Sequence, residues 1–224
     1  MEKISILWDL DGTIIDSVDL YYEAYRAVFK KYNLGPLNAA KAEYRSQYFG
    51  RAVEVFLRDH IPGPISDELM AAMKWDYLLA ANEHLMSSPD GGIRLIPGVD
   101  LVINAFFEKG YPMAIASTSW LPTVVHSLEK VGLLEKFANI SSGFLLPSKP
   151  APDVFRLAAA LNNMPVERCV VFEDSLAGMR GAKAAGMKCV GIGTSVDVSQ
   201  MEDADIRLVS YKKFVVHQVE NLFS

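Results

Sequence analysis

The chain has 224 residues, which is enough for one large domain or for one core with a small satellite domain. Acidic residues outnumber basic ones, 27 to 22, so the basic face that usually marks a nucleic-acid-binding protein is not expected. No apolar run approaches the roughly 18 residues needed to span a bilayer, and the first run leads directly into acids instead of a signal-peptide cleavage site. We therefore expect a cytoplasmic globular protein that binds neither nucleic acid nor membrane, with Cys169 and Cys189 as reduced core thiols.

The first predicted element is a buried strand over residues 4–9. It ends in two acids one residue apart, Asp9 and Asp11, and Gly12 follows, which allows the chain to turn sharply. The next part of the sequence contains no convincing strand. It shows three helical stretches separated by "LGPLN" and "IPGPIS", over about residues 18–32, 39–59 and 67–85. "SSPDGG" then reads as a linker.

After Pro97 the pattern changes to strands that alternate with helices. The expected strands are "PMAIAS", a short one in "FANISSG", "CVVFE", "KCVGIG" and "DIRLV". The expected helices cover about residues 99–108, 121–131, 153–161 and 176–185, and one more lies near the end of the sequence. Because such alternation produces a parallel sheet covered on both faces, we predict the α/β class with a doubly wound parallel sheet.

Ligands of doubly wound sheets bind at the carboxyl ends of the strands. Polar side chains stand at these positions: Asp9, Asp11 and Thr13 after the first strand, Ser117, Thr118 and Ser119 after the second, and Glu173, Asp174 and Ser175 after "CVVFE". Four converging carboxylates repel one another unless a cation lies between them, and Mg²⁺ prefers oxygen ligands. Lys149, in a proline-rich loop, and the hydroxyl groups suit an anion with several oxygens. Together these groups are typical of a phosphoryl-transfer site, with Asp9 as nucleophile and Asp11 as general acid and base.

Each residue also has a plainer interpretation. Glu173, Asp174 and Ser175 are suited to capping the next helix. Ser117 fits a turn, and Lys149 fits a solvated surface. The aromatic row of the first helix, with Tyr21, Tyr22, Tyr25 and Phe29, fits helix packing better than ligand stacking. The order of the polar residues, each at a predicted strand end or loop, favours the catalytic interpretation.

The same residues resemble the four motifs of the haloacid-dehalogenase-like (HAD) hydrolase superfamily. The motifs are "DLDGT" at residues 9–13, Ser117, Lys149 in "SKPAPD", and Glu173 with Asp174 in "FEDSLAG". "SKPAPDVF" followed by "VVFEDSLAG" is similar to the β-phosphoglucomutase-like branch, which includes many sugar-phosphate phosphatases. The resemblance covers nearly the whole chain. It implies a Rossmann-like core of residues 1–16 and 93–224, and a helical cap inserted over residues 17–92.

The resemblance also implies residue roles. Asp9 is the nucleophile and Asp11 the general acid and base, while Ser117 and Lys149 hold the phosphoryl oxygens. Mg²⁺ is held by Asp9, the backbone carbonyl of Asp11, and the acidic pair Glu173 and Asp174. Thr118, beside Ser117, is a further substrate-binding candidate, and Arg51 is the candidate for a substrate contact from the cap.

The predicted function is Mg²⁺-dependent hydrolysis of a small phosphomonoester, such as a sugar phosphate, through an aspartyl-phosphate. A phosphomutase of the same branch is the alternative, and a non-catalytic binding protein on this scaffold is a remote one. Mutases of the branch resemble this chain, but they carry a histidine where Tyr21 stands and a lysine where Trp120 stands. Tyrosine has a pKa of about 10 and cannot replace an imidazole. A small phosphorylated metabolite is the expected partner, and a monomer or weak homo-oligomer is the expected state.

Overall fold

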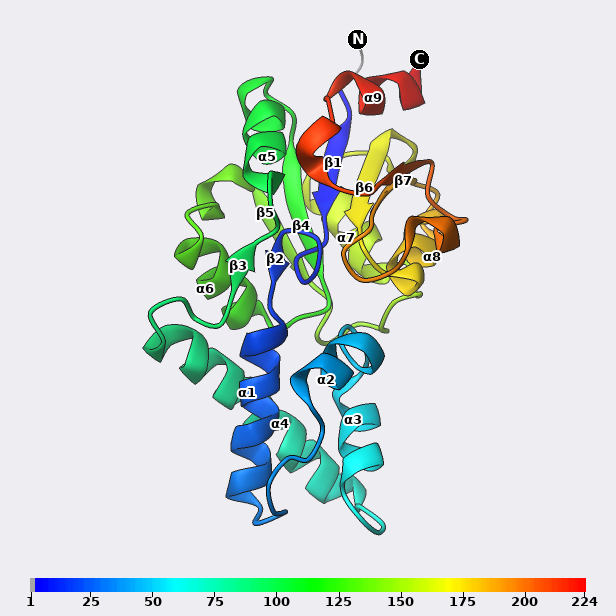
Figure 1. Ribbon diagram of the computed structural model, residues 1–224. Coiled ribbons are helices and arrows are strands. Elements are labelled where there is room, and N and C mark those ends of the chain that lie inside the picture. The colour runs from blue at the N-terminus through cyan, green and yellow to red at the C-terminus, as the bar shows by residue number, and fades with distance from the viewer. Residues whose placement is uncertain (1–2) are drawn as a thin grey trace. The chain divides into compact units, whose positions relative to one another are not determined.

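The computed structural model describes residues 3–224 of the chain (Figure 1). The chain divides into two compact units. One combines Met1–Asp16 with Leu95–Ser224 and is called the sheet unit here; the other is Ser17–Arg94, the helical unit. The short strands β2 (Ile15–Asp16) and β3 (Arg94–Leu95) pair with each other at the positions where the chain passes from one unit to the other. Neither of these two-residue strands was predicted.

The sheet unit is built on a parallel sheet, which has six strands in the order β5-β4-β1-β6-β7-β8 within residues 3–224. The strands are β1 (Ser5–Trp8), β4 (Met113–Ser117), β5 (Asn139–Ser142), β6 (Cys169–Glu173), β7 (Lys188–Ile192) and β8 (Ile206–Leu208). β1 lies between β4 and β6, where Leu7 pairs with Ala114 on one side and Val171 on the other. The predicted α/β class with a parallel sheet is confirmed, and β1, β4 and β6 all end at one edge.

Helices flank this sheet. They are α5 (Val99–Glu108), α6 (Leu121–Lys130), α7 (Asp153–Leu161), α8 (Leu176–Ala184) and α9 (His217–Glu220). Short 3-10 turns occur at Leu134–Lys136, Val166–Arg168, Val198–Gln200, Tyr211–Lys213 and Asn221–Phe223. Because side chains alternate along a strand, consecutive residues of β1 enter different layers. Leu7 packs in the cluster with Phe155 of α7 and Met179 of α8.

The opposite face of β1 is aromatic. The indole ring of Trp8 stacks on Phe172 of β6, with ring centroids 4.2 Å apart. Phe106 of α5 and Tyr211 of the C-terminal segment pack around this pair. Both faces of the central strand are therefore covered, which explains why its residues are fully buried. Cys169 and Cys189 are free thiols within the buried strands, as expected.

The helical unit contains α1 (Val18–Lys31), α2 (Lys41–Gln47), α3 (Val53–His60) and α4 (Asp67–Ser87). The single helix expected over residues 39–59 is wrong, because the chain breaks there into α2 and α3. Gly50 has a φ of 78°, which lies in the left-handed region and cannot continue a right-handed helix. Arg51 lies in this turn, and its backbone N–H donates to Tyr48 O at 2.9 Å.

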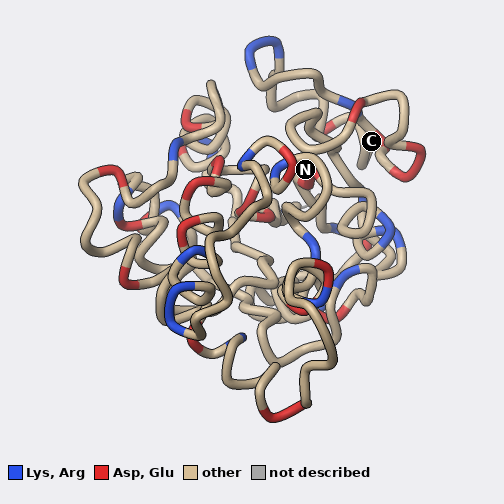
Figure 2. Tube along the Cα trace, turned by 60° about the horizontal axis from the view of Figure 1, so that its bottom comes forward, with Lys and Arg blue, Asp and Glu red and all other residues tan. Residues whose placement is uncertain are grey.

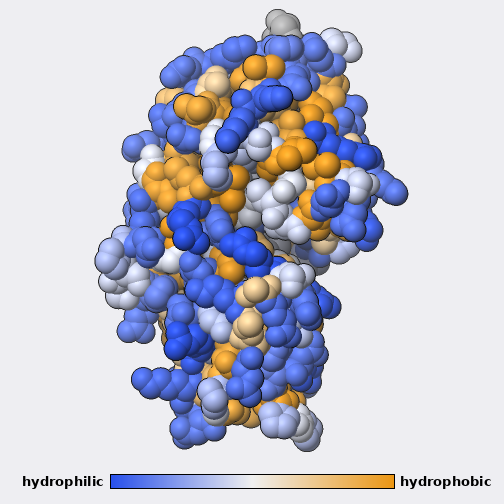
Figure 3. Space-filling view, viewed as in Figure 1, coloured by the Kyte–Doolittle hydropathy of each residue, from blue (hydrophilic) through white to orange (hydrophobic). Residues whose placement is uncertain are grey.

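An aromatic cluster forms the core of the helical unit. The Tyr25 ring of α1 lies 4.0 Å from Phe56 of α3 and 4.5 Å from Tyr77 of α4, measured between centroids. Tyr21 stacks on the same Tyr77 ring at 5.9 Å. The aromatic row of α1 therefore serves packing, which was the plainer interpretation. Outside this core, the face seen in Figure 3 is mostly hydrophilic over the helical unit, with small apolar spots.

Acidic and basic residues are interspersed along the trace of both units (Figure 2). Figure 2 shows no large region of a single charge sign in this view, in keeping with the modest net charge of -5. Among residues 3–224, no helix combines the length and the apolarity that a membrane crossing requires.

Candidate active site

The end of β1 is shaped by Gly12. Asp9 continues the strand, because its N–H donates to Phe172 O of β6 at 3.0 Å. The chain then turns back, and the Gly12 N–H donates to Ile15 O at 2.7 Å. Gly12 has a φ of 87°, and a Cβ atom at this position would overlap the carboxylate of Asp174. A glycine is thus required twice, by the backbone conformation and by the close approach of Asp174.

The end of β6 supplies Glu173 and Asp174, both almost fully buried. Ser175 is the N-cap of α8, and its Oγ accepts from the Gly178 N–H at 3.0 Å. The capping interpretation therefore applies to Ser175 and not to the two acids. Glu173 braces the same turn, since its Oε1 accepts from the N–H and the Oγ of Ser175 at 3.0 and 2.7 Å.

Lys149 connects the two strand ends. Its Nζ donates to Asp9 Oδ1 at 2.5 Å and to Glu173 Oε2 at 2.8 Å. The side chain is 9% exposed and its ammonium group lies over the Phe155 ring, 4.9 Å from the centroid. A solvated surface lysine is excluded by this burial. Burial alone would lower the pKa of Lys149, but Asp9 and Glu173 reverse the effect, and the pKa is raised.

Three carboxylates converge around this lysine. Asp9, Glu173 and Asp174 each offer an oxygen atom, and these atoms lie within 4.8 Å of one another. Burial raises the pKa of Asp9 well above its ordinary value, and Glu173 adds to the effect against the opposing charge of Lys149. Burial, followed by Glu173, raises the pKa of Asp174 to about 7. A single lysine therefore leaves this site short of positive charge.

The carboxylate of Asp11 is not part of that three-acid cluster, although it lies at the same edge of the sheet. Its Oδ2 accepts a hydrogen bond from Ser119 Oγ at 2.6 Å. The reason is strand geometry: Asp11 lies beyond the end of β1, within the turn that brings Gly12 back to Ile15. Its side chain is therefore directed to the residues that follow β4, which is the neighbouring strand.

Ser117 and Thr118 lie at the carboxyl end of β4. Ser117 is buried, and its Oγ accepts from the Ser119 N–H at 3.0 Å, which leaves its own proton for donation. Thr118 is exposed. Arg51 belongs to the helical unit, where its guanidinium donates to Gln47 O at 3.2 Å; its contact with a substrate stays a prediction.

Several hydroxyl groups around the acids were not predicted as site residues. Thr13 Oγ1 donates to Asp174 Oδ1 at 3.1 Å, and Ser195 Oγ donates to Asp174 Oδ2. Thr194 Oγ1 donates to Gly12 O at 2.5 Å. Thr194 and Ser195 lie just after β7. Because ligands of parallel sheets bind at the carboxyl ends of the strands, the position of these two residues in the sequence is the signal that could have identified them.

The donor set fits a hard divalent cation. Mg²⁺ takes oxygen ligands and is commonly held by one or two carboxylates together with waters and substrate phosphate. The buried oxygens of Asp9 and Asp174, with Glu173 beside them, provide such ligands. The pKa values of Asp9 and Asp174 are raised by burial and by the negative charge of Glu173, and a bound divalent cation would oppose both effects.

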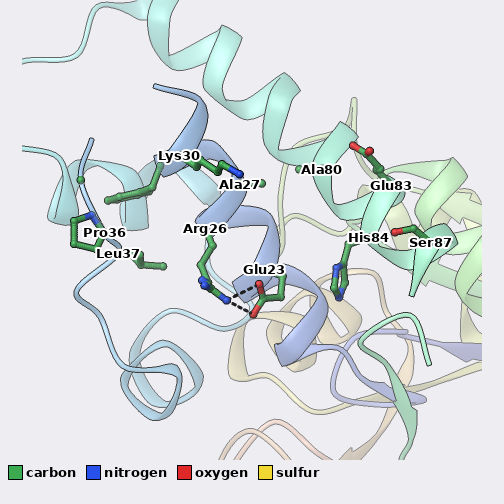
Figure 4. A pocket seen from close by; sticks show the side chains of 12 residues that line it. Glu23, Arg26, Ala27, Lys30, Pro36, Leu37, Ala80, Glu83, His84 and Ser87 are labelled. Atoms are coloured by element: carbon green, nitrogen blue, oxygen red, sulfur yellow. Dashed lines mark hydrogen bonds and ion pairs between the residues drawn. The ribbon is translucent and has the colours of Figure 1, made fainter. Parts of the chain in front are cut away.

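A hollow of about 660 Å³ also lies within the helical unit, beside α1, α4 and the loop that follows α1 (Figure 4). Its charges are mixed, with Glu23, Arg26, Lys30 and Glu83 in the lining. Figure 4 shows Arg26 paired with Glu23, and these groups are 2.9 Å apart. None of the predicted site residues lines this hollow, Arg51 included, so the candidate active site remains the edge of the sheet.

Residues 6–192 match the haloacid dehalogenase-like hydrolases, and the chain belongs to this family. It is therefore a hydrolase, and the match confirms the resemblance found in the sequence. The chain is 25% identical to hexitol phosphatase A of Escherichia coli (strain K12) over 215 residues, covering 96% of this chain and 94% of that protein.

Two solved structures have the same fold. That of CbbY from Rhodobacter sphaeroides in complex with phosphate is 28% identical, with a TM-score of 0.80, and covers 95% of this chain and 96% of that one. The β-phosphoglucomutase from Clostridium difficile has a TM-score of 0.79 and covers 98% and 96% of the two chains. At 19% identity, the second comparison speaks for the fold alone.

Proposed function

We propose that this hydrolase is a Mg²⁺-dependent phosphatase that cleaves a small phosphomonoester through a phosphorylated Asp9. The observation that carries the proposal is the contact of Lys149 with both Asp9 and Glu173 at the carboxyl edge of the sheet, 2.5 and 2.8 Å long. A buried lysine, three carboxylates suited to a divalent cation and a serine proton available for donation match the needs of a transferring phosphoryl group.

In the first step, a carboxylate oxygen of Asp9 attacks phosphorus while the bond from phosphorus to the leaving oxygen breaks. The electron pair of that bond goes to the leaving oxygen, which takes a proton from Asp11. Ser117 and Lys149 hold the phosphoryl oxygens, with Thr118 beside them. Bound Mg²⁺ would supply charge neutralisation for the phosphoryl group, held by Asp9, Asp174, Glu173 and the backbone carbonyl of Asp11.

In the second step, water attacks the phosphorus atom of the aspartyl-phosphate. Asp11, now ionised, takes a proton from this water, and the bond between phosphorus and the Asp9 oxygen breaks with its electron pair returning to the carboxylate. Inorganic phosphate leaves and Asp9 is regenerated. Asp11 must therefore pass through both protonation states in each turnover.

Hydrolysis is favoured over phosphoryl return to a sugar. Tyr21 stacks on Tyr77 in the aromatic core of the helical unit and offers no imidazole. Trp120, the N-cap of α6, offers one neutral donor in place of the ammonium group of the mutases. Both replacements weaken retention of a bisphosphate intermediate, so water should complete the reaction. The relative named hexitol phosphatase A supports a polyhydroxylated monophosphate as the substrate class.

A panel of about a hundred phosphorylated metabolites, with phosphate release as the readout, tests the proposal. Asp9→Asn should fold normally and lose turnover, whereas the matched control Asp203→Asn, a partly exposed acid of the same unit, should keep it. A chelator should abolish activity and added Mg²⁺ restore it. β-Glucose 1-phosphate with bisphosphate primer should give no glucose 6-phosphate. Isomerisation faster than phosphate release would establish the mutase instead, and a near wild-type rate in Asp9→Asn would contradict the nucleophile.

A further inference from the structure

The hydroxyl of Ser119 lies 2.6 Å from the carboxylate of Asp11 and donates to its Oδ2. The sequence placed Ser119 among the hydroxyl residues at the strand ends without assigning it a role, and the mechanism above does not use it. We infer that Ser119 is a positioning residue that orients the carboxyl group of Asp11 for proton transfer to the leaving oxygen. This inference rests on the proposed function, in which Asp11 is the general acid and base.

Ser119 is itself fixed from two sides. Its backbone N–H donates to Ser117 Oγ at 3.0 Å, and its carbonyl accepts from Ser142 Oγ at 2.8 Å. The Gly143 N–H also donates to Ser117 O at 2.7 Å, so the turn after β4 is tied to the end of β5. A donor held by strand ends keeps its direction better than a donor on an exposed loop tip. The backbone of Ser119, from which the hydroxyl projects, is thus held in place by the ends of the strands.

A neutral hydroxyl is the appropriate partner for a group that changes its charge. Serine can donate to an ionised carboxylate and, after rotation about its C–O bond, accept from a protonated one. An ammonium group can only donate and would favour the ionised form throughout. The Ser119 hydroxyl can therefore stay hydrogen-bonded to Asp11 in both protonation states of its carboxyl group.

The test compares leaving groups, because only a poor leaving group needs a proton from Asp11. Ser119→Ala and Ser119→Thr are assayed on p-nitrophenyl phosphate and on an alkyl phosphate that the wild type hydrolyses. Ser141→Ala is the matched control, since its buried hydroxyl donates to Val154 O at 2.8 Å and not to Asp11. The readout is kcat/KM, which reports the transfer of the phosphoryl group from the substrate to Asp9 and not the later hydrolysis of the aspartyl-phosphate.

Ser119→Ala should lower kcat/KM on the alkyl phosphate by about 10- to 100-fold, the lower part of the range for general acid catalysis, through kcat and not KM. The loss on p-nitrophenyl phosphate should stay below about threefold, and Ser119→Thr should recover most of the alkyl-phosphate activity. Equal losses on both substrates, no loss on either, or no recovery in Ser119→Thr would overturn the inference.

Crystal structures of the wild type and Ser119→Ala provide a measurement that is independent of turnover. The carboxyl group of Asp11 should rotate away from its wild-type orientation in Ser119→Ala, and an unchanged orientation would overturn the inference. A wild type that releases no phosphate from any substrate would overturn the proposed function, while the crystallographic comparison would still decide the role of Ser119. If Ser119→Ala does not fold, Ser119→Thr tests the role of Ser119. Because threonine retains the hydroxyl group, this variant must keep both the orientation of the Asp11 carboxyl group and the activity on the alkyl phosphate.

Discussion

Replacing Lys149 by methionine should affect both the rate and the stability of the protein. Methionine keeps much of the length of the side chain but removes the charge that contacts Asp9 and Glu173. We expect the rate to fall by about 10²-fold or more, the scale observed when one preorganised transition-state donor is removed. The effect on stability follows from burial, since the side chains of Lys149, Asp9 and Glu173 are only 9%, 8% and 1% exposed.

Breaking a buried ion pair by removing one partner costs about 3–5 kcal/mol, because it leaves an uncompensated charge. For a chain of this size, about 2–4 °C of melting temperature corresponds to each kcal/mol, so a loss of about 6–20 °C is expected without metal at pH 8. The loss should shrink towards pH 5. The raised pKa of Asp9 means that this carboxyl group takes up a proton as the pH falls, and the unpaired charge then disappears.

The assay is thermal unfolding at pH 5 and pH 8, with chelator or with Mg²⁺. Lys183→Met is the matched control, because Lys183 also pairs with an aspartate, Asp205, but is 38% exposed. Such a pair contributes about 0–1 kcal/mol, and Lys188 lies near the same carboxylate. Added Mg²⁺ should recover part of the stability of Lys149→Met but leave Lys183→Met unchanged. If the two variants melt alike, or if the loss in Lys149→Met is the same at both pH values, charge compensation by Lys149 is refuted.

Three further predictions concern the acids. Without metal at pH 8, Asp174→Ala should be no less stable than the wild type. The variant loses the hydrogen bonds that Thr13 and Ser195 donate to Asp174, but it also removes a buried negative charge, which offsets that loss. A clear fall in melting temperature would contradict this prediction. The stabilisation of the wild type by Mg²⁺ should grow from pH 5.5 to pH 8. The pKa of Asp174 is raised to about 7, so the protonated carboxyl group stabilises the metal-free fold at low pH, and this stabilisation is lost as the pH rises through 7. The ion binds only the ionised carboxylate, which forms over the same pH range. A melting-temperature shift by Mg²⁺ that does not change with pH would refute this prediction. Gly178→Ala should remain folded yet lose most phosphate release, since its Cβ would overlap the Glu173 carboxylate; unchanged kinetics would show that Glu173 tolerates displacement.

Much of the fold could be predicted because a parallel sheet buried on both faces requires continuous apolar runs. β1, β4 and β6 are such runs, and their ends are the positions where the acids and Ser117 occur. The two-residue strands β2 and β3 are too short to produce a periodic pattern. The break between α2 and α3 was missed because its signal is a single residue, Gly50, inside an otherwise helical pattern.

The part of the site that could be predicted consists of the residues that belong to sequence motifs. Asp9, Lys149, Glu173 and Asp174 were identified, and they meet at one edge of the sheet. The hydrogen-bond partners of these residues could not be predicted, because serine and threonine are common in turns and nothing in the sequence ties Ser119 to Asp11 across more than a hundred residues. Contacts of this kind depend on the register between neighbouring strands, which the apolar pattern alone does not give.

The charges of the site also explain why its groups form a set. Asp9, Glu173 and Asp174 would carry three negative charges when ionised, and Lys149 returns one positive charge, so the remaining deficit equals one divalent cation. Without that ion, the raised pKa values of Asp9 and Asp174 make protons the substitute. A protonated Asp9 is a poor nucleophile, because attack on phosphorus requires the carboxylate. In the proposed mechanism, the charge imbalance that makes the metal-free site costly to bury would therefore also make Asp9 depend on the cation for its role as nucleophile.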